Sequence, residues 1–537
     1  QKDDWQKNKA ARQKCRVAPD LLFNQQVCSS RLTRGGIRCL GMNLSHAFAV
    51  SAEAHARKPA LFWGDQEHTY ELLLAQSRLV ARHLHEQLGV RPGDRVGLWL
   101  KNCPEFVSAL FGILQVGGVV VPLNNFYKLD ELHHILADAG IRVLITDGAM
   151  AEHLPALGAL HPELRTWAVE ELARPENAAA ILTSRPPAVR PLTPDDLAVL
   201  VYTSGTTGRA KGAMLTHGNL LHNVDSCRQV LAAVDHDRFV VLLPMFHSFM
   251  LTVGVLLPMI VGGSVLLIRS LHPAKNVLQE IYQRQATILP AVPSFFRTLV
   301  SAPLPPGLPL RVCISGGAPL PVEILRDFNR AMPFPLIEGY GLSEASPVVS
   351  LNPLQGPWKE GSIGKPIPGV EISVQDEQGT VLPLGATGEI CVRGGNVMRG
   401  YWNQPDASAR ALRNGWLLTG DVGHGDADGY FYITDRKKDM LIVNGINVYP
   451  REIEEVLYQM PGVKEAAVVG MPDPRRGEHP VAFVAPKEGT SLEEQTVLQF
   501  VKQRLADYKV PKRVTFLAAL PRNATGKVLK TALRKQP

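Results

Sequence analysis

The amino-acid sequence predicts an α/β fold built on parallel sheets, with a smaller unit at the carboxyl end. Short apolar runs of strand length lie at 95–100, 118–122, 143–146 and 197–202, and amphipathic stretches of helical period separate them. This alternation is typical of parallel strands joined by crossover helices. The chain has 537 residues, 45% of them hydrophobic and 20% charged. That composition is typical of a globular enzyme, and the length exceeds a single core, so we expect at least two domains.

The first 41 residues differ from the rest of the chain in charge. They hold nine Lys or Arg against three Asp, whereas residues 42–537 hold 48 positive and 47 negative side chains. A nearly neutral body does not favour polyanions, so we expect no nucleic-acid partner. We interpret residues 1–41 as a disordered basic extension upstream of a start at Met42. A targeting peptide around residues 31–38 is the alternative, which the three aspartates disfavour.

Two features bear on the location of the protein. Phe249–Ile268 is uncharged over 20 residues, about the length that spans a bilayer. Pro258 and the pair Gly262-Gly263 interrupt it, so we predict a buried helix, a glycine turn and a buried parallel strand there, with no transmembrane helix. The seven cysteines are scattered without a CxxC pair. This pattern favours a reducing compartment, and we expect a cytoplasmic protein.

The character of the sequence changes after about residue 435, where a charge run at 435–439 precedes a compact unit of about one hundred residues. We expect a large domain at 42–437, a charged hinge and a small domain at 438–537. The elements expected in the small domain are a helix at 450–459, strands at 465–470 and 481–485, a helix at 492–506 and a strand at 513–518.

A loop rich in glycine and hydroxyl residues follows the apolar run at 197–202. Its candidate ligand-binding residues are Thr203, Ser204, Gly205, Thr206, Thr207, Gly208 and Lys211. Glycines let backbone N–H groups approach an anion, the hydroxyls add donors and the lysine adds charge, so the loop is suited to hold phosphates. It is not a Walker A loop, because Gly212 follows the lysine and the glycine spacing differs. Taken alone, the loop has a flexible surface loop as its alternative interpretation, which we rank below a phosphate-binding loop.

Five further motifs follow this loop in order. They are Gly316-Gly317-Ala318-Pro319-Leu320, Gly339-Tyr340-Gly341-Leu342-Ser343-Glu344, Gly415-Trp416-Leu417-Leu418-Thr419-Gly420-Asp421, Asp435-Arg436-Lys437-Lys438-Asp439 and Pro521-Arg522-Asn523-Ala524-Thr525-Gly526-Lys527. Together with the loop, they resemble the motifs of the adenylate-forming superfamily, which includes acyl- and aryl-CoA synthetases, luciferases and adenylation domains of peptide synthetases. The resemblance covers about residues 44–533. It implies a large N-terminal domain of parallel-sheet αβα layers with a β-barrel-like subdomain, and a small mobile α+β C-terminal domain.

The resemblance also implies a nucleotide site, and the residue types suit it. An aromatic face between two glycines can stack on a purine, and a carboxylate beside a hydroxyl offers hard oxygen ligands for Mg²⁺. A carboxylate and a guanidinium can bind a ribose diol. The residues assigned to adenine and the nearby backbone are Gly317, Ala318, Pro319, Gly339, Tyr340, Gly341 and Ser343. Those assigned to the metal are Glu344 and Thr203, and those assigned to the ribose are Asp421 and Arg436.

By resemblance, the catalytic residues are Lys527, Glu344, Lys211 and His247. Lys527 would bridge the substrate carboxylate and the transferring phosphate, and His247 would lie at the gate between the nucleotide and the acyl tunnel. The superfamily rotates its C-terminal domain about a hinge, here at Lys438, and so presents Gly445 to the pantetheine channel. Taken alone, each of these residues would be an ordinary surface or loop residue.

The sequence around 414–450 resembles the signature of bacterial medium- and long-chain fatty acyl-CoA synthetases. We therefore expect ATP, Mg²⁺ and coenzyme A as cofactors and a fatty acid as substrate, with peripheral membrane contact left open. Ala210 replaces the usual Pro of the phosphate loop, and Leu418 replaces the usual His of the fatty-acid signature. An aryl or short-chain acyl-CoA ligase, and an acyl-AMP ligase that serves a carrier protein, are the alternatives. A non-catalytic nucleotide-binding relative is disfavoured, because Lys527 and Glu344 are present, and we expect a monomer or homodimer.

Overall fold

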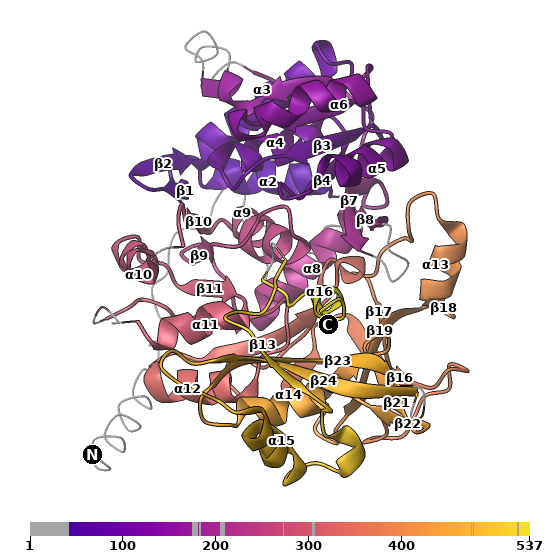
Figure 1. The fold of residues 1–537 in the computed structure, drawn as a ribbon. Helices are drawn as coiled ribbons and strands as arrows, with labels where there is room; N and C mark the ends of the chain where they lie inside the picture. Colours follow the sequence, from indigo (N-terminus) through magenta and orange to yellow (C-terminus); the bar gives the residue numbers. More distant parts are fainter. Residues whose placement is uncertain are drawn as a thin grey trace. The chain divides into compact units, whose positions relative to one another are not determined.

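The structure is a computed structural model, which describes residues 42–173, 181, 184–204, 210–271, 273–302, 305, 307–473, 475, 477–523 and 526–536. The extension predicted at 1–41 therefore lies outside the described residues. Within the described ranges the predicted fold class is confirmed: a large N-terminal domain built on parallel strands is followed by a smaller mixed α and β domain (Figure 1).

A six-stranded sheet forms the first part of the large domain. The four strands expected from the apolar runs are present in it, and the runs at 95–100, 118–122 and 143–146 are almost entirely buried, as parallel strands with helices on both faces require. Its strands, in spatial order, are β6 (Arg165–Ala168), β5 (Val143–Thr146), β3 (Arg95–Trp99), β4 (Val119–Pro122), β7 (Leu197–Ser204) and β8 (Ala210–Thr216). The helices beside it are α2 (Leu44–Ala54), α3 (Tyr70–Glu86), α4 (Pro104–Gln115), α5 (Leu129–Ala139), η1 (Gly148–His153), α6 (Leu154–Leu160) and η2 (Val169–Ala173).

A second sheet begins with parallel strands. They are β1 (Pro59–Trp63), β10 (Ser264–Leu267), β9 (Arg238–Val241), β11 (Ile288–Ala291), β12 (Val312–Ser315) and β13 (Leu336–Gly341), with β2 (Gln66–Thr69) antiparallel at the edge. The helices that accompany them are α8 (His217–Val230), η3 (Met250–Leu256), α9 (Leu257–Val261), α10 (Ala274–Gln283), α11 (Pro293–Val300), α12 (Val322–Ala331) and η4 (Ser343–Ala345).

The uncharged segment Phe249–Ile268 forms helices and one strand of this second sheet, as the sequence predicts. It forms η3, a π-helix, and then α9, which ends at Gly262 with φ of +82°. Strand β10 follows and pairs in parallel with β1 and β9. Among the described residues, no helix is long and apolar enough to cross a membrane.

The sheet continues from β13 into antiparallel strands, which correspond to the part expected to form a β-barrel-like subdomain. In the described ranges these strands and the parallel ones follow one another in a single path. They are β14 (Val348–Leu351), β15 (Ser362–Pro366), β20 (Phe431–Arg436), β19 (Trp416–Gly425), β17 (Gly388–Gly394) and β16 (Val370–Gln375), with β18 (Leu412–Arg413) beside β19 and α13 (Pro405–Ala411) before it.

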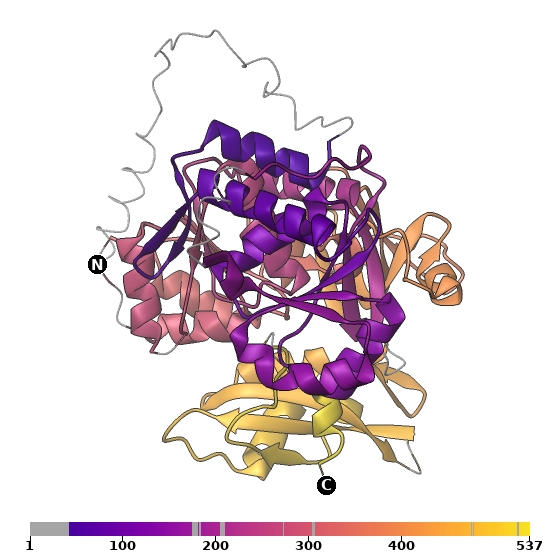
Figure 2. The same cartoon turned by 90° about the horizontal axis from the view of Figure 1, so that it is seen from above.

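The small domain has its own sheet with a buried cluster on each face. Figures 1 and 2 show its yellow strands and helices as a separate layer. Val468 packs with α14 and α15 on one face, whereas Val469 packs with Leu520 and Leu533 of the final segment on the other, as the two-residue period of a strand requires. The elements are β21 (Leu441–Val443), β22 (Ile446–Val448), α14 (Pro450–Tyr458), β23 (Val463–Asp473), β24 (Gly477–Pro486), α15 (Glu494–Lys502), η5 (Asp507–Lys509), β25 (Val514–Phe516) and α16 (Lys530–Leu533).

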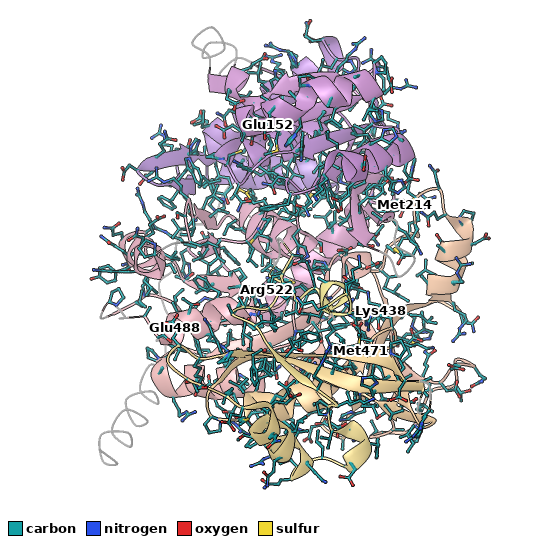
Figure 3. The ribbon with its side chains drawn as sticks, in the orientation of Figure 1. Glu152, Met214, Lys438, Met471, Glu488 and Arg522 are labelled. Carbon is teal, nitrogen blue, oxygen red and sulfur yellow. The ribbon has the colours of Figure 1, made fainter. Side chains whose placement is uncertain are left out.

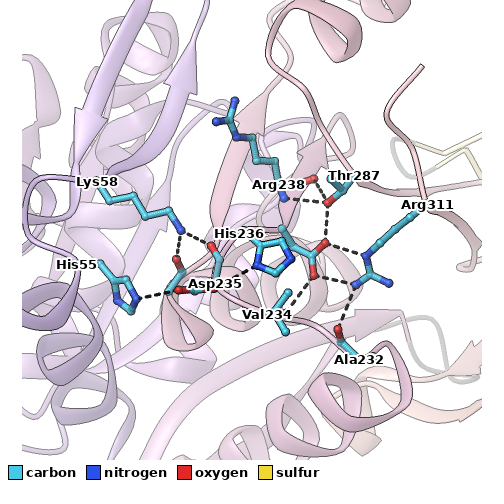
Figure 4. A network of polar contacts seen from close by, with 11 residues as sticks. His55, Lys58, Ala232, Val234, Asp235, His236, Arg238, Thr287 and Arg311 are labelled. Atoms are coloured by element: carbon cyan, nitrogen blue, oxygen red, sulfur yellow. Dashed lines mark hydrogen bonds and ion pairs between the residues drawn. The ribbon is translucent and has the colours of Figure 1, made fainter. Parts of the chain in front are cut away.

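A polar network fixes the amino-terminal ends of β9, β11 and β12 (Figure 4). The carboxylate of Asp237, only 1% exposed, binds the Arg311 guanidinium at 2.7 Å and accepts a hydrogen bond from the Thr287 hydroxyl at 2.8 Å. The neighbouring Asp235 is 58% exposed and faces His55 at 3.7 Å. Burial raises the pKa of Asp237, but its hydrogen bonds outweigh this and hold the pKa below its usual value. The ionised carboxylate is therefore a structural anchor.

Replacing Asp237 with asparagine is expected to destabilise the large domain by about 2 kcal/mol, because Arg311 loses its partner inside the protein. The midpoint of urea unfolding measures the change. Asp235→Asn is the matched control, and it should change stability by less than about 0.5 kcal/mol because its ion pairs are exposed. Equal shifts in the two variants would contradict the assignment of Asp237 as the anchor.

Candidate active site

A cavity of about 990 Å³ lies at the carboxyl ends of β12 and β13 and receives residues from both domains. This is the edge of a parallel sheet where ligands usually bind. The predicted site residues that line it are Thr203, Lys211, His247, Gly317, Gly339, Tyr340, Gly341, Ser343, Glu344, Arg436, Lys438 and Lys527. Lys438 is labelled in Figure 3.

Other predicted site residues do not line the cavity or are not described. Asp421 lies behind Tyr340 and Arg436, Ala318 and Pro319 follow Gly317 without reaching the lining, and Gly445 lies in the turn between β21 and β22. Ser204 is the last residue of β7. Gly205, Thr206, Thr207 and Gly208 lie outside the described residues.

Tyr340, Asp421 and Arg436 form a cluster at the cavity in which Asp421 is buried and the other two side chains are partly exposed. Asp421 and Arg436 face each other across β19 and β20, and the Arg436 Nε lies 3.0 Å from Asp421 Oδ1. The Tyr340 hydroxyl donates to Asp421 Oδ2 at 2.6 Å. Burial and the nearby carboxylate raise the pKa of Tyr340, and Asp421 raises the pKa of Arg436. The cluster therefore presents a fixed aromatic ring and a fixed cation at the cavity wall.

Glu338, which sequence reasoning missed, holds the backbone near Gly317. Its Oε1 accepts a hydrogen bond from the Leu320 N–H at 3.0 Å, and burial raises its pKa to about 7. Gly317 has φ of +77°, a left-handed conformation that favours glycine. A Cβ on Gly316 would lie 3.0 Å from the Phe249 ring. The turn therefore packs too closely for larger residues.

The hydroxyl and the cation that flank the phosphate loop lie close to Glu344 and to Tyr401, respectively. Thr203 and Lys211 are partners across the β7–β8 hairpin. The Thr203 hydroxyl donates to Glu344 Oε1 at 3.3 Å, and the Tyr401 hydroxyl donates to the same oxygen at 2.9 Å. The Lys211 Nζ lies 5.3 Å from the centre of the Tyr401 ring. Glu344 lies in η4, the short turn after β13 of the second sheet, so its hydrogen bond with Thr203 of β7 connects the two sheets at the cavity.

The final segment that carries Lys527 is fixed on both sides. Arg522 forms an ion pair with Glu465 of β23 at 2.5 Å, and Lys530 forms one with Glu454 of α14 at 2.8 Å. These pairs hold the turn between them, and Lys527 reaches the cavity from that turn.

Contacts with the large domain place the same turn over the cavity. Gly526 has φ of +81°, and a Cβ at this position would lie only 3.3 Å from the Val292 side chain. The Arg297 guanidinium of α11 lies 5.3 Å from the Tyr458 ring of α14. Such cation–π contacts are favourable when desolvated, and burial lowers the pKa of Arg297 here. These contacts therefore seat the small domain with its lysine inside the site.

Charge and burial perturb two titratable groups in the cavity. Burial, followed by the charge of Arg436, lowers the pKa of Lys527 to about 8. Burial and the charge of Lys527 lower the pKa of His247 to about 4. His247 Nδ1 accepts a hydrogen bond from the Phe249 N–H at 3.3 Å, so a neutral ring carries its proton on Nε2.

Asn102, a second residue that sequence reasoning missed, fixes the loop that carries His247. Its side-chain amide donates to the Leu243 carbonyl at 2.8 Å and accepts from the Met245 N–H at 2.8 Å. Asn102 lies just before α4, so the six-stranded part of the large domain holds a loop of the second sheet.

One wall of the cavity is apolar. It is formed by buried side chains of α8, η3, β12 and β14 and by the residue that directly follows α8. These residues are Cys227, Leu231, Val253, Ile314, Val348 and Leu351. A hydrocarbon group fits this wall better than a charged one, because an unpaired charge is costly to bury.

An aromatic ring, a paired carboxylate and guanidinium, and lysines beside hydroxyls are groups that suit a nucleotide, and here residues of two domains bring them to one cavity. Residues 48–402 match the AMP-binding enzyme family, and residues 452–527 match the AMP-binding enzyme C-terminal domain. The chain belongs to the AMP-binding enzyme family.

Curated relatives match nearly the whole chain. A long-chain-fatty-acid–CoA ligase of Bacillus subtilis is 36% identical over 522 residues, covering 90% of this chain and 93% of the relative. A feruloyl-CoA synthase of an Amycolatopsis species is 40% identical over 470 residues, covering 86% and 92%.

Solved structures resemble the fold closely. ATP-bound MatB from Rhodopseudomonas palustris has a TM-score of 0.85 and 34% identity, covering 92% of this chain and 99% of that one. The anthranilate CoA ligase AuaEII in complex with anthranoyl-AMP has a TM-score of 0.84 and 29% identity, covering 92% and 97%.

Proposed function

We propose that this enzyme activates a fatty acid with ATP and transfers the acyl group to coenzyme A. The observation that carries the proposal is the position of Lys527, which the small domain inserts into a cavity shared with the Tyr340 cluster, Glu344 and Lys211. Family membership and the names of the relatives support it. The products would be acyl-CoA, AMP and pyrophosphate.

In the first step, an oxygen of the acid attacks the α-phosphorus of ATP, and the bond to pyrophosphate breaks. Two anions must meet, so cations are needed on both. We propose that Lys527 contacts the carboxylate and the α-phosphate, and that Lys211 contacts the departing phosphates. Fixed charges that need no reorganisation lower such a barrier most effectively. The Tyr340 ring would stack on adenine, and Asp421 with Arg436 would bind the ribose.

The residues at the cavity fit a magnesium ion that arrives with the nucleotide. The Glu344 carboxylate and the Thr203 hydroxyl supply hard oxygen donors within 3.3 Å of each other. Among the described residues there is no cluster of three or more His, Cys, Asp or Glu that could hold a metal, in keeping with an ion held by one carboxylate and by substrate phosphates. When bound, the ion would neutralise charge on the leaving pyrophosphate.

In the second step, the thiolate of coenzyme A attacks the acyl carbonyl and AMP leaves. Lys527 would obstruct this approach, so we propose that the small domain, 438–537, rotates about Lys438 away from the large domain, 42–437. Lys438 follows β20 and lines the cavity. Rotation would bring the turn at Gly445 to the site. Gly445 has φ of +78° and ends a tight hairpin between β21 and β22.

The apolar wall and the long-chain relatives support a medium- or long-chain fatty acid. The second candidate substrate is an aryl acid. It is favoured by the identity of the feruloyl-CoA synthase to this chain, 40%, which exceeds the 36% of the long-chain ligase of Bacillus subtilis. An acyl-AMP ligase that serves a carrier protein is the third alternative from the sequence. The expected cytoplasmic location, peripheral membrane contact and monomeric or homodimeric state stay predictions.

A substrate panel tests this proposal. Pyrophosphate release is measured with ATP and Mg²⁺ on acetate, octanoate, palmitate and a cinnamate, each with and without coenzyme A. We expect octanoate or palmitate to give turnover that continues to a thioester. Turnover on the cinnamate alone would favour an aryl ligase. Release without a thioester would favour an acyl-AMP ligase, and no release with any acid would overturn the proposal.

The lowered pKa of Lys527 predicts the pH dependence of adenylate formation. The protonated amine is the active form, so kcat/KM for pyrophosphate release should fall as pH rises through about 8. Coenzyme A is omitted, because its thiol titrates in the same range. Lys527→Arg is the control: its rate should be lower but independent of pH there, because the guanidinium stays charged. The same falling limb in both proteins would contradict the assignment.

A further inference from the structure

Tyr401 lies between two groups that the proposed reaction needs at the phosphates. Its hydroxyl donates to Glu344 Oε1 at 2.9 Å, and its ring centre lies 5.3 Å from the Lys211 Nζ. The side chain lines the cavity. Neither the phosphate loop nor the other sequence motifs include it. A single side chain therefore contacts the candidate metal ligand and a candidate phosphate ligand at once.

The backbone around Tyr401 is fixed to the same elements. The Trp402 N–H donates to the Gly212 carbonyl at 2.8 Å, and the Met214 N–H donates to the Gly400 carbonyl at 2.9 Å, so the segment pairs with β8 just after the phosphate loop. Met214 is labelled in Figure 3. The Met398 N–H donates to the Glu344 carbonyl at 2.8 Å. Motion of this segment is therefore restricted relative to both partners of the tyrosine.

The two hydrogen bonds to the Glu344 carboxylate both end on the same oxygen. Thr203 and Tyr401 both donate to Oε1, and in the described ranges no bond to Oε2 is seen. Two donors on one oxygen restrict the rotation of the carboxylate while the other oxygen keeps its lone pairs. The tyrosine hydroxyl is thereby fixed on one oxygen of the carboxylate.

We propose that Tyr401 is a positioning residue that aims the Glu344 carboxylate at the nucleotide's magnesium ion and holds the Lys211 ammonium toward the phosphates. The inference rests on the proposed function, since it assumes that this cavity binds ATP with Mg²⁺. It assigns separate tasks to two parts of one side chain. The hydroxyl acts on the metal ligand, and the ring acts on the lysine.

Two substitutions separate these tasks. Tyr401→Phe removes the hydroxyl and keeps the ring, so it should weaken the Mg²⁺ dependence of ATP binding by about 10-fold, as expected for a group that orients a metal ligand. Its affinity for ATP in EDTA should equal that of the wild type. Tyr401→Leu also removes the ring, so its affinity for ATP in EDTA should fall by about 2- to 5-fold.

Isothermal titration of the full chain with ATP measures these affinities, with Mg²⁺ or with EDTA and without acid or coenzyme A. Tyr432→Phe is the matched control, because the Tyr432 hydroxyl donates to a carboxylate, Asp426 Oδ2, at 3.1 Å and does not line the cavity. It should bind ATP as the wild type does. Far-UV circular dichroism checks that each variant is folded.

The outcomes separate this inference from the proposed function. If the wild type binds ATP with Mg²⁺ dependence and Tyr401→Phe binds in the same way, the positioning role is wrong and the proposed function stands. If Tyr401→Phe loses affinity equally with Mg²⁺ and with EDTA, the hydroxyl has a general structural role and the inference is also overturned. If the wild type itself does not bind ATP, the proposed function fails together with the inference.

Discussion

Lys527→Ala is expected to slow adenylate formation by about 1,000-fold, because the reaction loses the cation that we propose contacts both the carboxylate and the α-phosphate. Pyrophosphate release in the absence of coenzyme A measures this step. The second step should behave differently. When acyl-adenylate is supplied ready-made with coenzyme A, thioester formation by the variant should stay close to the wild-type rate, because the proposed domain rotation would remove Lys527 from the site in this step.

Lys535→Ala is the matched control for this experiment. Lys535 is an exposed lysine of the same final segment, so its removal changes the net charge equally and should leave both steps unchanged. Equal losses of both half-reactions in Lys527→Ala would contradict the assignment of this lysine to adenylate formation alone. Such a result would indicate a general defect in the seating of the small domain.

Asp421→Ala should produce the second large effect, a rise of about 100-fold in the dissociation constant for ATP. Asp421 is 3% exposed and binds both Tyr340 and Arg436. Removing it leaves the Tyr340 hydroxyl and the partly exposed Arg436 guanidinium without the buried carboxylate that fixes both of them at the cavity wall. Titration with ATP measures the change. The dissociation constant of Asp421→Asn, whose amide can still accept a hydrogen bond from Tyr340, should lie between those of the wild type and Asp421→Ala.

Glu371→Ala is the matched control for Asp421→Ala. Glu371 faces Arg393 across β16 and β17 in an ion pair of 2.6 Å, but the side chains are 62% and 49% exposed. An exposed pair of this kind contributes little, so ATP affinity should not change. Wild-type affinity in Asp421→Ala would show that the cluster does not contact the nucleotide, and the proposed site would have to be revised.

The fold was predictable from the sequence wherever local pattern decides structure. The inner strands of the six-stranded sheet are continuous apolar runs. Such runs are typical of a parallel sheet that has helices on both faces. The pattern failed at the β23–β24 hairpin. Strands were expected at 465–470 and 481–485, but they extend to Val463–Asp473 and Gly477–Pro486. Proline and glycine usually mark the end of a strand in a sequence. The paired residues near the turn of this hairpin nevertheless include Pro472, Gly477 and Pro480.

The candidate site was predictable in its motifs but not in its supporting contacts. Lys527 and Glu344 stand in recognisable motifs, so the resemblance located them. Tyr401 and Asn102 could not be found in this way, because their roles depend on partners 57 and 143 residues away in the chain. A single sequence carries no signal for such pairs, since only the folded chain brings them together. Glu338 was missed for another reason: its burial, which raises its pKa to about 7, is a property of the assembled sheet.

The most direct test of the central claim is the product balance of one reaction. The full chain is incubated with palmitate or octanoate, ATP, Mg²⁺ and coenzyme A, and the nucleotide and thioester products are quantified by mass spectrometry. The account predicts acyl-CoA and AMP in equal amounts. Thioester formation with ADP in place of AMP, or ATP cleavage that yields no acyl product from any acid, would contradict it.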